Sequence, residues 1–339
     1  MERSLLTVDL GAVRRNVRTL LRALDGAELW PVVKADAYGH GALDVSRAAL
    51  DAGARALCVA TVAEGLALRR ELLESRILVM GPPFDPADVA AAAQAGLELA
   101  HVDGPVPEGV AVHLKLESGM GRFGLSELPA PPANVVGLMS HLATADTDEA
   151  FALEQVDRFR RATEPYSHLT RHIAASAAAL RIPSARFDAA RCGIAVYGLS
   201  PFGADPAADG LEPVLRWESR LAQVRLLGPG ESTGYGRRFV AERPTWIGLV
   251  PVGYGDGFAR DLTGTDVLVA GQRRRVVGTI SMDSFAVELD RELPVGTHVV
   301  LLGDGVLAEH HARVAGTINY EIVTRIRSEP ARMGRMVRS

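Results

Sequence analysis

The stretch ELWPVVKADAYGHG, residues 28–41, joins an apolar run to a lysine and then to a glycine-rich turn. Residues 29–33 are all apolar or proline, as in a buried strand, and the run ends at Lys34. Lys34 is therefore either a surface lysine that reaches solvent or an amine kept reactive by apolar surroundings. Tyr38 and the Gly-His-Gly turn follow before the next expected helix, an arrangement suited to binding a phosphate group.

The same succession of apolar run, turn and helical stretch recurs along the first two thirds of the chain. Seven further runs follow the first: ALCVAT, RILVMG, LELAHV, VAVHLKL, VVGLMSHL, LTRHIAAS and RCGIAVYG. Helix starts lie between them, with a capping box from Thr61 to Glu64 and with Asp85 before Pro86. Eight strand–helix units predict an α/β fold, a parallel (β/α)8 TIM barrel with Lys34 at the active-site end of its first strand. A doubly wound sheet would give similar local signals.

The composition changes near PFGADPAADGLEP, residues 201–213. Beyond it, helical periodicity nearly vanishes, and short apolar runs are separated by glycine and proline turns: VLRWESRLAQVRLL, TWIGLVPVG, DVLVAG, RRVVGTI, FAVELD and HVVLLG. We therefore expect a barrel domain at residues 1–212 and a mainly-β C-terminal domain at residues 213–339.

The overall composition excludes several classes of protein. Hydrophobic residues make up 47% and charged residues 23% of the 339 residues, as in soluble globular proteins, and the net charge of −4 offers no basic surface for nucleic acid or an anionic membrane. No signal peptide or membrane-spanning run is recognisable, so we expect a cytoplasmic protein without a nucleic-acid or membrane partner. Cys58 and Cys192 lack metal-ligand spacing, so we expect two buried thiols and no metal.

The segment VHLKLESGMGRFG, residues 112–124, places ionisable side chains along a strand. Alternation directs His113, Lys115 and Glu117 to one side, so Lys115 becomes a buried cation in need of a partner if that side faces the barrel interior. An ion pair between Lys115 and Glu117, with Arg122 on the surface, is the structural alternative.

Other candidates are weaker when taken singly. His141 and His172 lie at or just before strand ends, and Arg191 enters a glycine-containing turn. Ser176 begins a helix and could be an ordinary N-cap. Tyr235, Tyr254 and Tyr320 are three of only six tyrosines, and the first two stand in Gly-Tyr-Gly contexts that either expose the phenol or let it pack over a hairpin.

Taken together, these segments resemble the alanine racemase family, from TVDLGAVRRNV to TINYEIVTRI, with VVKADAYGHG the most specific motif. The resemblance implies a barrel followed by a β domain, pyridoxal 5'-phosphate (PLP) as cofactor, and a homodimer with shared active sites. It also implies interconversion of L-alanine and D-alanine by two bases, supplying D-alanine for peptidoglycan. Lys34 would hold the cofactor as a Schiff base and act as one base, and Tyr235 of the partner subunit would act as the other.

The resemblance assigns the remaining candidates as well. The phosphate would be held by Tyr38, Ser176, Tyr320 and the backbone of Gly193 and Ile194. Arg191, oriented by His172, would face the pyridine nitrogen. The substrate side would consist of Arg122, Met282 and Tyr254, with His141 near Tyr235 and a carbamylated Lys115 positioning Arg122. Ala175 replaces the family's asparagine and Thr279 its arginine, so the resemblance fixes the reaction type better than substrate affinity.

Three alternatives stay open at this level. The chain could racemise serine, lysine or a broad set of amino acids, because the residues that shape the side-chain pocket are not identifiable. A non-catalytic PLP-binding protein uses a similar barrel but needs neither the β domain nor an opposite-face tyrosine. A decarboxylase that combines a barrel with a β domain is the third.

Overall fold

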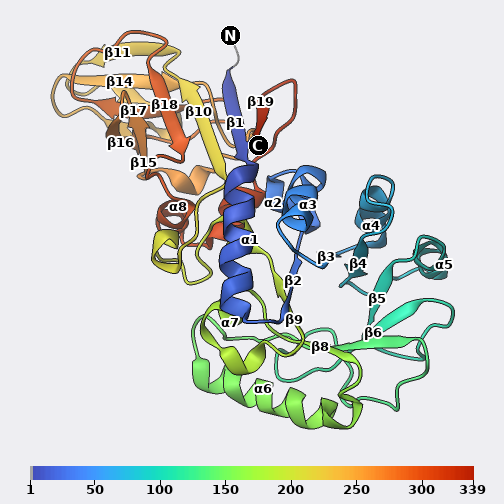
Figure 1. The fold of residues 1–339 in the computed structure, drawn as a ribbon. Helices are drawn as coiled ribbons and strands as arrows, with labels where there is room; N and C mark the ends of the chain where they lie inside the picture. The colour runs from blue at the N-terminus through green and yellow to red at the C-terminus, as the bar shows by residue number, and fades with distance from the viewer. Residues whose placement is uncertain (1–2) are drawn as a thin grey trace. The chain divides into compact units, whose positions relative to one another are not determined.

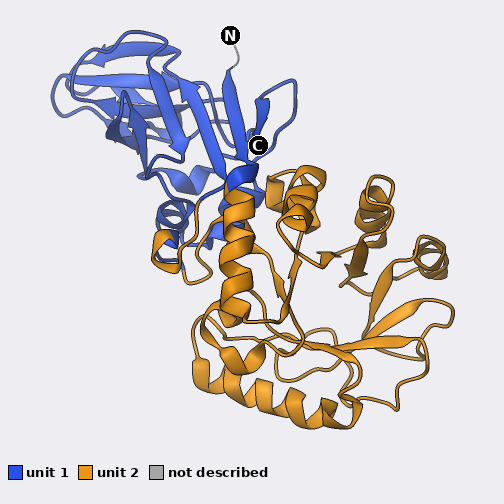
Figure 2. Ribbon diagram, in the orientation of Figure 1, with its two compact units in different colours: residues 1–11, 203–206, 213–339 blue, residues 12–202, 207–212 orange. Residues whose placement is uncertain are grey.

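The computed structural model describes residues 3–339, which divide into two compact units (Figures 1 and 2). The barrel unit contains residues 12–202 and 207–212. The β unit contains residues 203–206, residues 213–339 and the described residues up to Gly11.

The barrel unit is built on eight parallel strands in the order β2-β9-β8-β7-β6-β5-β4-β3. Their bounds are Glu28–Pro31 (β2), Ala56–Val59 (β3), Arg76–Val79 (β4), Glu98–His101 (β5), Ala111–Lys115 (β6), Val135–Met139 (β7), Thr170–His172 (β8) and Ala189–Cys192 (β9). The sheet closes between its first and last strands, because Val32 forms a parallel bridge with Cys58 and the Val33 N–H donates to the Cys58 carbonyl at 2.8 Å. All eight apolar runs are therefore strands of one closed barrel, and the doubly wound alternative is excluded.

The helices of the barrel unit follow the strands, as Figure 1 shows for α4 and α5 beside β3, β4 and β5. Both expected helix starts are present: Thr61 and Glu64 form a reciprocal capping box, and the Asp85 side chain accepts from the Ala87 N–H at 2.7 Å. The helix bounds are Leu10–Leu24 (α1), Lys34–Gly39 (α2), Ala42–Asp51 (α3), Val62–Arg69 (α4), Pro86–Gln94 (α5), Glu149–Thr163 (α6) and Ser176–Arg181 (α7).

The core of the barrel unit consists of strand residues from both faces of the sheet together with apolar helix faces. Trp30, Leu29 and Leu57 are fully buried. Cys58 and Cys192 are buried free thiols, as expected, and burial raises the pKa of each to about 12. Neither thiol is therefore ionised at neutral pH.

The β unit is dominated by a nine-stranded sheet in the order β11-β14-β17-β16-β15-β18-β10-β1-β19, with a separate pair β12-β13. The bounds are Ser4–Asp9 (β1), Leu215–Arg220 (β10), Gln223–Leu227 (β11), Ser232–Thr233 (β12), Phe239–Val240 (β13), Thr245–Val250 (β14), Asp266–Val269 (β15), Gln272–Val277 (β16), Phe285–Leu289 (β17), His298–Leu302 (β18) and Gly334–Arg338 (β19). This mainly-β architecture agrees with the sequence-based expectation.

Two features of the β unit differ from that expectation. Strand β1 pairs antiparallel with β10 and parallel with β19, so the N-terminal segment belongs to the β unit and not to a barrel domain that starts at residue 1. The unit also contains two short helices, Ala308–Ala315 (α8) and Asn319–Thr324 (α9), where we expected almost no helix. They are linked by a hydrogen bond from the Asn319 amide to the Glu309 carboxylate at 2.9 Å.

Candidate active site

Lys34 follows the end of β2 and begins a turn of left-handed helix. Residues 35–38 all have φ between 51° and 57°, although none of them is glycine. Each L-residue in this region costs roughly 1–2 kcal/mol, so the surroundings must hold the turn in place. The Ala35 N–H donates to the Glu64 carboxylate at 2.8 Å, and the Asp36 side chain accepts from the Ala42 N–H at 2.7 Å. These bonds fix the chain on both sides of the turn.

The amine of Lys34 is half-buried and its pKa is shifted toward the neutral form. Burial lowers the pKa, and the positive charge of Arg122 lowers it further, while Glu64 acts in the opposite direction. A larger neutral fraction makes the amine a better nucleophile toward a carbonyl group.

The left-handed turn brings Tyr38 against the end of β9. A Cβ atom at Gly193 would lie 2.5 Å from the Tyr38 hydroxyl, so only glycine permits this approach. The Ala195 N–H donates to the Ser176 hydroxyl at 3.3 Å, and Gly193 and Ile194 lead into the 3-10 turn Ile194–Tyr197, whose first N–H groups have no acceptor within the turn. Two hydroxyls and these N–H groups therefore converge, as binding a phosphate requires.

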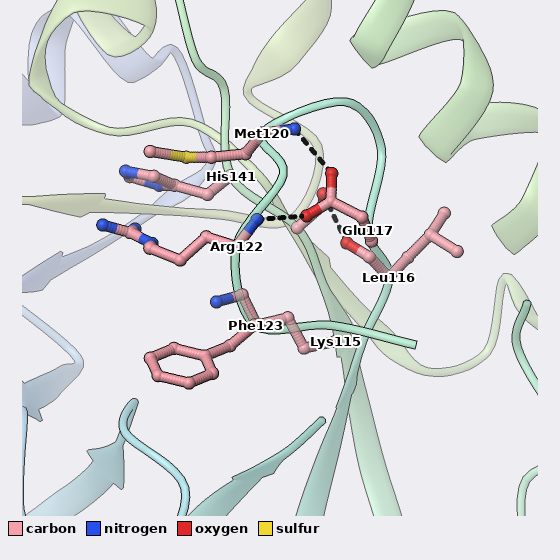
Figure 3. A pocket seen from close by; sticks show the side chains of 8 residues that line it. Lys115, Leu116, Glu117, Met120, Arg122, Phe123 and His141 are labelled. Carbon is pink, nitrogen blue, oxygen red and sulfur yellow. Dashed lines mark hydrogen bonds between the residues drawn. The ribbon is translucent and has the colours of Figure 1, made fainter. Parts of the chain in front are cut away.

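Basic side chains gather at the ends of β6, β7 and β9. Lys115 is 8% exposed, and burial, followed by Arg122 and Arg191, lowers its pKa to about 8. Figure 3 shows Lys115, Arg122 and His141 extending toward the same side of a pocket, which Glu117 and Phe123 also line. Burial, together with Arg191 and Arg122, lowers the pKa of His141 to about 3, so its ring is neutral at physiological pH.

Glu117 does not pair with Lys115. Its carboxylate accepts from the N–H groups of Gly119, Met120 and Arg122 at 2.6, 2.5 and 3.0 Å, as Figure 3 shows for the last two. Burial acts to raise the pKa of Glu117, but these backbone bonds hold it below its usual range. Within residues 3–339 no ion pair joins Lys115 to Glu117, so that part of the structural alternative is wrong. Arg122 is exposed, as the same alternative expected.

Arg191 is buried on β9 and held by groups of two neighbouring strands. One terminal nitrogen contacts His172 Nδ1 at 2.5 Å and the His172 carbonyl at 2.9 Å. The other donates to the Ser140 carbonyl at 2.7 Å and lies 3.4 Å from His141 Nδ1. Burial lowers the pKa of Arg191 to about 10, which still leaves the guanidinium charged at neutral pH.

The expected residues of the β unit form a second group. The loop between β16 and β17 gathers three of them, because the Thr279 hydroxyl donates to the Tyr235 carbonyl at 2.7 Å and the N–H groups of Tyr254 and Gly255 donate to the carbonyls of Ser281 and Met282. The side chains of Tyr235, Tyr254 and Met282 are exposed, with 74% for Tyr235. The tyrosines therefore do not simply pack over hairpins. Tyr320 lies on α9 and is half-buried.

Some features of the site were not anticipated. Ser176 is the first residue of α7 and Ala175 its N-cap, without a side-chain capping bond. The sequence predicts that His113 shares a face of its strand with Lys115 but indicates no role for it. It indicates no role for Glu98 or Arg76 either, although His113 contacts Glu98 and Glu98 contacts Arg76. Each is signalled in the sequence by its polarity within a short strand that is otherwise mostly apolar.

Comparison with known proteins places the chain in one family. Alanine racemase N-terminal domains match residues 8–201, and alanine racemase C-terminal domains match residues 214–334. Alanine racemase 1 of Bacillus subtilis (strain 168) is 39% identical over 356 residues, covering 96% of this chain and 91% of that protein. The alanine racemase of Geobacillus stearothermophilus is 40% identical over 354 residues, covering 93% and 89%.

Solved structures agree with this placement. The biosynthetic alanine racemase of Pseudomonas aeruginosa has a TM-score of 0.93 at 35% identity and full coverage of both chains. The Bacillus anthracis alanine racemase with bound L-Ala-P has a TM-score of 0.86 at 32% identity and covers 100% of this chain and 96% of that one. The chain therefore belongs to the alanine racemase family.

Proposed function

We propose that the protein is a PLP-dependent alanine racemase that interconverts L-alanine and D-alanine. The observation that carries this proposal is the half-buried Lys34, whose pKa is lowered by burial and by Arg122, at the end of β2 in a chain of this family. The relatives named above are alanine racemases over nearly their full length, and one was solved with bound L-Ala-P.

The side chains of the barrel unit suit PLP. Lys34 supplies an amine for the aldehyde, and the hydroxyls of Tyr38 and Ser176, with the N–H groups of Gly193 and Ile194, suit the phosphate. Burial raises the pKa of Tyr38 well above its usual range, so it stays a hydroxyl donor toward an anion. Arg191 remains protonated and would donate to the pyridine nitrogen without giving up its proton. When bound, PLP would spread the negative charge that develops as the substrate Cα loses its proton.

Racemisation needs a proton to leave one face of Cα and another to arrive at the opposite face. Lys34 would serve one face, and Tyr235 of the partner subunit would serve the other. In one chain Tyr235 is 74% exposed on the β unit, available to a second copy. We therefore propose a homodimer with shared active sites, in which Met282 and Tyr254 of the partner subunit border the substrate and Tyr320 joins the phosphate site.

Lys115 has the properties needed for carbamylation. Only a neutral amine adds to carbon dioxide, and with a pKa of about 8 roughly one Lys115 in ten is neutral at pH 7. The product, a carbamate on Lys115, is an anion. It would replace the Lys115 ammonium group beside Arg122 and orient the Arg122 guanidinium toward the substrate carboxylate. This removes the repulsion between Lys115 and Arg122 that contributes to the low pKa.

Chiral chromatography tests the proposal directly. Purified protein with PLP is incubated with L-alanine, and D-alanine is expected to approach half of the total, because the enantiomers have equal free energy. L-Serine and L-lysine are run beside it to measure the substrate range. Lys34→Ala is the matched control, and loss of alanine to an amine product, or no D-alanine, would contradict the proposal.

A further inference from the structure

A chain of buried polar contacts runs through the barrel interior away from the site. We call Arg191, His172, His113, Glu98 and Arg76 the histidine chain. The His172 Nδ1 contact with Arg191 is followed by His172 Nε2 to His113 Nδ1 at 2.8 Å and His113 Nε2 to the Glu98 carboxylate at 2.8 Å. The Arg76 Nε donates to the other Glu98 oxygen at 2.6 Å.

The histidine chain connects the two ends of the barrel. Arg76 and Glu98 begin β4 and β5, whereas Arg191 lies near the C-terminal end of β9, where the site is. His113 and His172 are fully buried, and the Trp30 ring packs against both, with centroids 5.8 and 4.6 Å away. The contacts are thus protected from water along most of their length.

Gly137 makes the contact between the two histidines possible. Strand β7 lies between β6, which carries His113, and β8, which carries His172. A Cβ atom at Gly137 would lie 2.2 Å from His113 Nδ1, so any other residue would occupy the space where the rings meet. The histidines therefore touch across an intervening strand because that strand has no side chain at this position.

The geometry permits a single arrangement of protons. Glu98 only accepts, since hydrogen bonds from His113 and Arg76 outweigh its burial and keep its pKa low, so His113 Nε2 donates to it. Burial lowers the pKa of both histidines, which makes both rings neutral. His113 Nδ1 must then accept from His172 Nε2, and His172 Nδ1 must accept from Arg191. Any other arrangement sets two donors against each other at one of these contacts.

We propose that Glu98 is a positioning residue whose carboxylate fixes the proton arrangement of His113 and His172 and thereby holds the Arg191 guanidinium at the site. The proposal rests on the role given to Arg191 in the proposed function. With an acceptor at Nδ1 and its carbonyl, His172 occupies both N–H groups of one Arg191 terminal nitrogen, and Ser140 occupies one N–H group of the other. The Nε–H is then left to serve a ring nitrogen. Glu98 acts on the reaction only through Arg191.

Replacing Glu98 with glutamine disturbs this arrangement without changing the shape of the side chain. The amide has one oxygen, but Arg76 and His113 both donate at this position, so only one of them can be satisfied. Arg76→Gln is the matched control, because Glu98 still accepts from His113. The double variant Arg76→Gln/Glu98→Gln removes the competing donor and leaves the amide oxygen for His113, so it is expected to restore the arrangement.

The experiment is nitrogen-15 NMR of the histidine rings in the full-length protein, without and with PLP. In the wild type and in Arg76→Gln we expect His113 and His172 as neutral rings protonated at Nε2. In Glu98→Gln, His113 and His172 should no longer be present only as neutral rings protonated at Nε2, and in the double variant this form should be restored. The proposal would be overturned if the histidine rings of Glu98→Gln had the same protonation as those of the wild type. It would also be overturned if the double variant showed the same altered protonation as Glu98→Gln. This readout does not depend on whether the protein racemises alanine.

Kinetics of the PLP-loaded enzyme test the link to Arg191. We expect Glu98→Gln to lower kcat about tenfold with little change in KM, because a histidine in the wrong tautomer misplaces the group that it orients. The double variant should recover most of this loss, which a merely destabilising change would not allow. Altered histidine rings with a wild-type kcat would show that Arg191 does not depend on Glu98.

Discussion

Replacing Thr279 with valine tests whether the loop between β16 and β17 positions Tyr235. The hydroxyl of Thr279, a residue only 7% exposed, donates to the Tyr235 carbonyl at 2.7 Å. Valine keeps the shape and removes a hydrogen bond worth about 1 kcal/mol. If the whole of this free energy is added to the activation barrier for proton transfer through Tyr235, that step slows about fivefold, because about 1.4 kcal/mol corresponds to a tenfold change in rate.

The assay is the deuterium isotope effect on kcat/KM, measured separately with L-alanine and D-alanine labelled at Cα. The enantiomers have equal free energy, so kcat/KM must stay equal in the two directions and cannot itself show which face is affected. If Tyr235 takes the proton from L-alanine, a slower step at Tyr235 makes the isotope effect rise from L-alanine and fall from D-alanine. A general loss of stability would not change the two values in opposite directions.

Thr263→Val is the matched control for this experiment. The Thr263 hydroxyl donates to the Gly278 carbonyl at 3.0 Å, beside Thr279 in the same loop, and to the Arg260 carbonyl at 3.2 Å. We expect wild-type isotope effects from it, and also from Thr279→Ser, which keeps the donor. Wild-type isotope effects in Thr279→Val, or equal changes in Thr263→Val, would refute the reasoning.

Three further predictions concern Lys34 and Tyr235, the two proposed bases, and Lys115, the lysine proposed to be carbamylated. Borohydride reduction should attach PLP covalently to the wild type and not to Lys34→Ala, as read by mass spectrometry of the intact protein. Mixing inactive Lys34→Ala and Tyr235→Phe subunits should restore roughly a quarter of wild-type activity, because half of the dimers are then mixed and each has one intact site; no recovery would contradict a shared site. Because burial, Arg122 and Arg191 lower the pKa of Lys115 to about 8, the neutral amine increases as the pH rises through that value. Activity should accordingly fall in buffer free of carbon dioxide and return with bicarbonate, more completely at pH 8.5 than at pH 6.5, and Lys115→Met should show no such response.

The barrel was predictable because its strands are buried on both faces. Such strands are nearly continuous apolar runs, and the eight runs coincide with β2 to β9. The capping box at Thr61 was also predictable, because it depends only on residues that are close in the sequence. In contrast, α8 and α9 are too short to show a clear helical periodicity in the sequence. The pairing of β1 with β19 joins segments from the two ends of the chain, so no local sequence pattern predicts it.

The site was predictable in its residue types but not in its contacts. Lys34 and Arg191 could be named as candidates because charged groups at the ends of apolar strands are unusual, whereas their roles follow only from the resemblance to the family. The left-handed turn at residues 35–38 gives no such signal, because none of the four residues is glycine. The contact of His113 with His172 depends on the register of three strands and on the missing side chain at Gly137, and only the folded barrel brings these together.

The charges of the barrel unit explain why its site suits an anionic cofactor and an anionic substrate group. After the effect of burial, positive neighbours lower the pKa of Lys34, Lys115 and His141: Arg122 acts on all three, and Arg191 also acts on the last two. Among the described residues that line the pocket, Glu117 is the one carboxylate; its oxygens accept from backbone N–H groups, and no ion pair joins it to Lys115 or Arg122. A bound phosphate or carboxylate therefore enters a field that is favourable without any new charge. A carbamate on Lys115 would reduce that field beside Arg122 and His141, both of which interact with the Lys115 charge. The positive charge of Arg122 also lowers the pKa of Lys34 and so increases the neutral fraction of its amine. The same charges that favour an anion at the site therefore make Lys34 a better nucleophile.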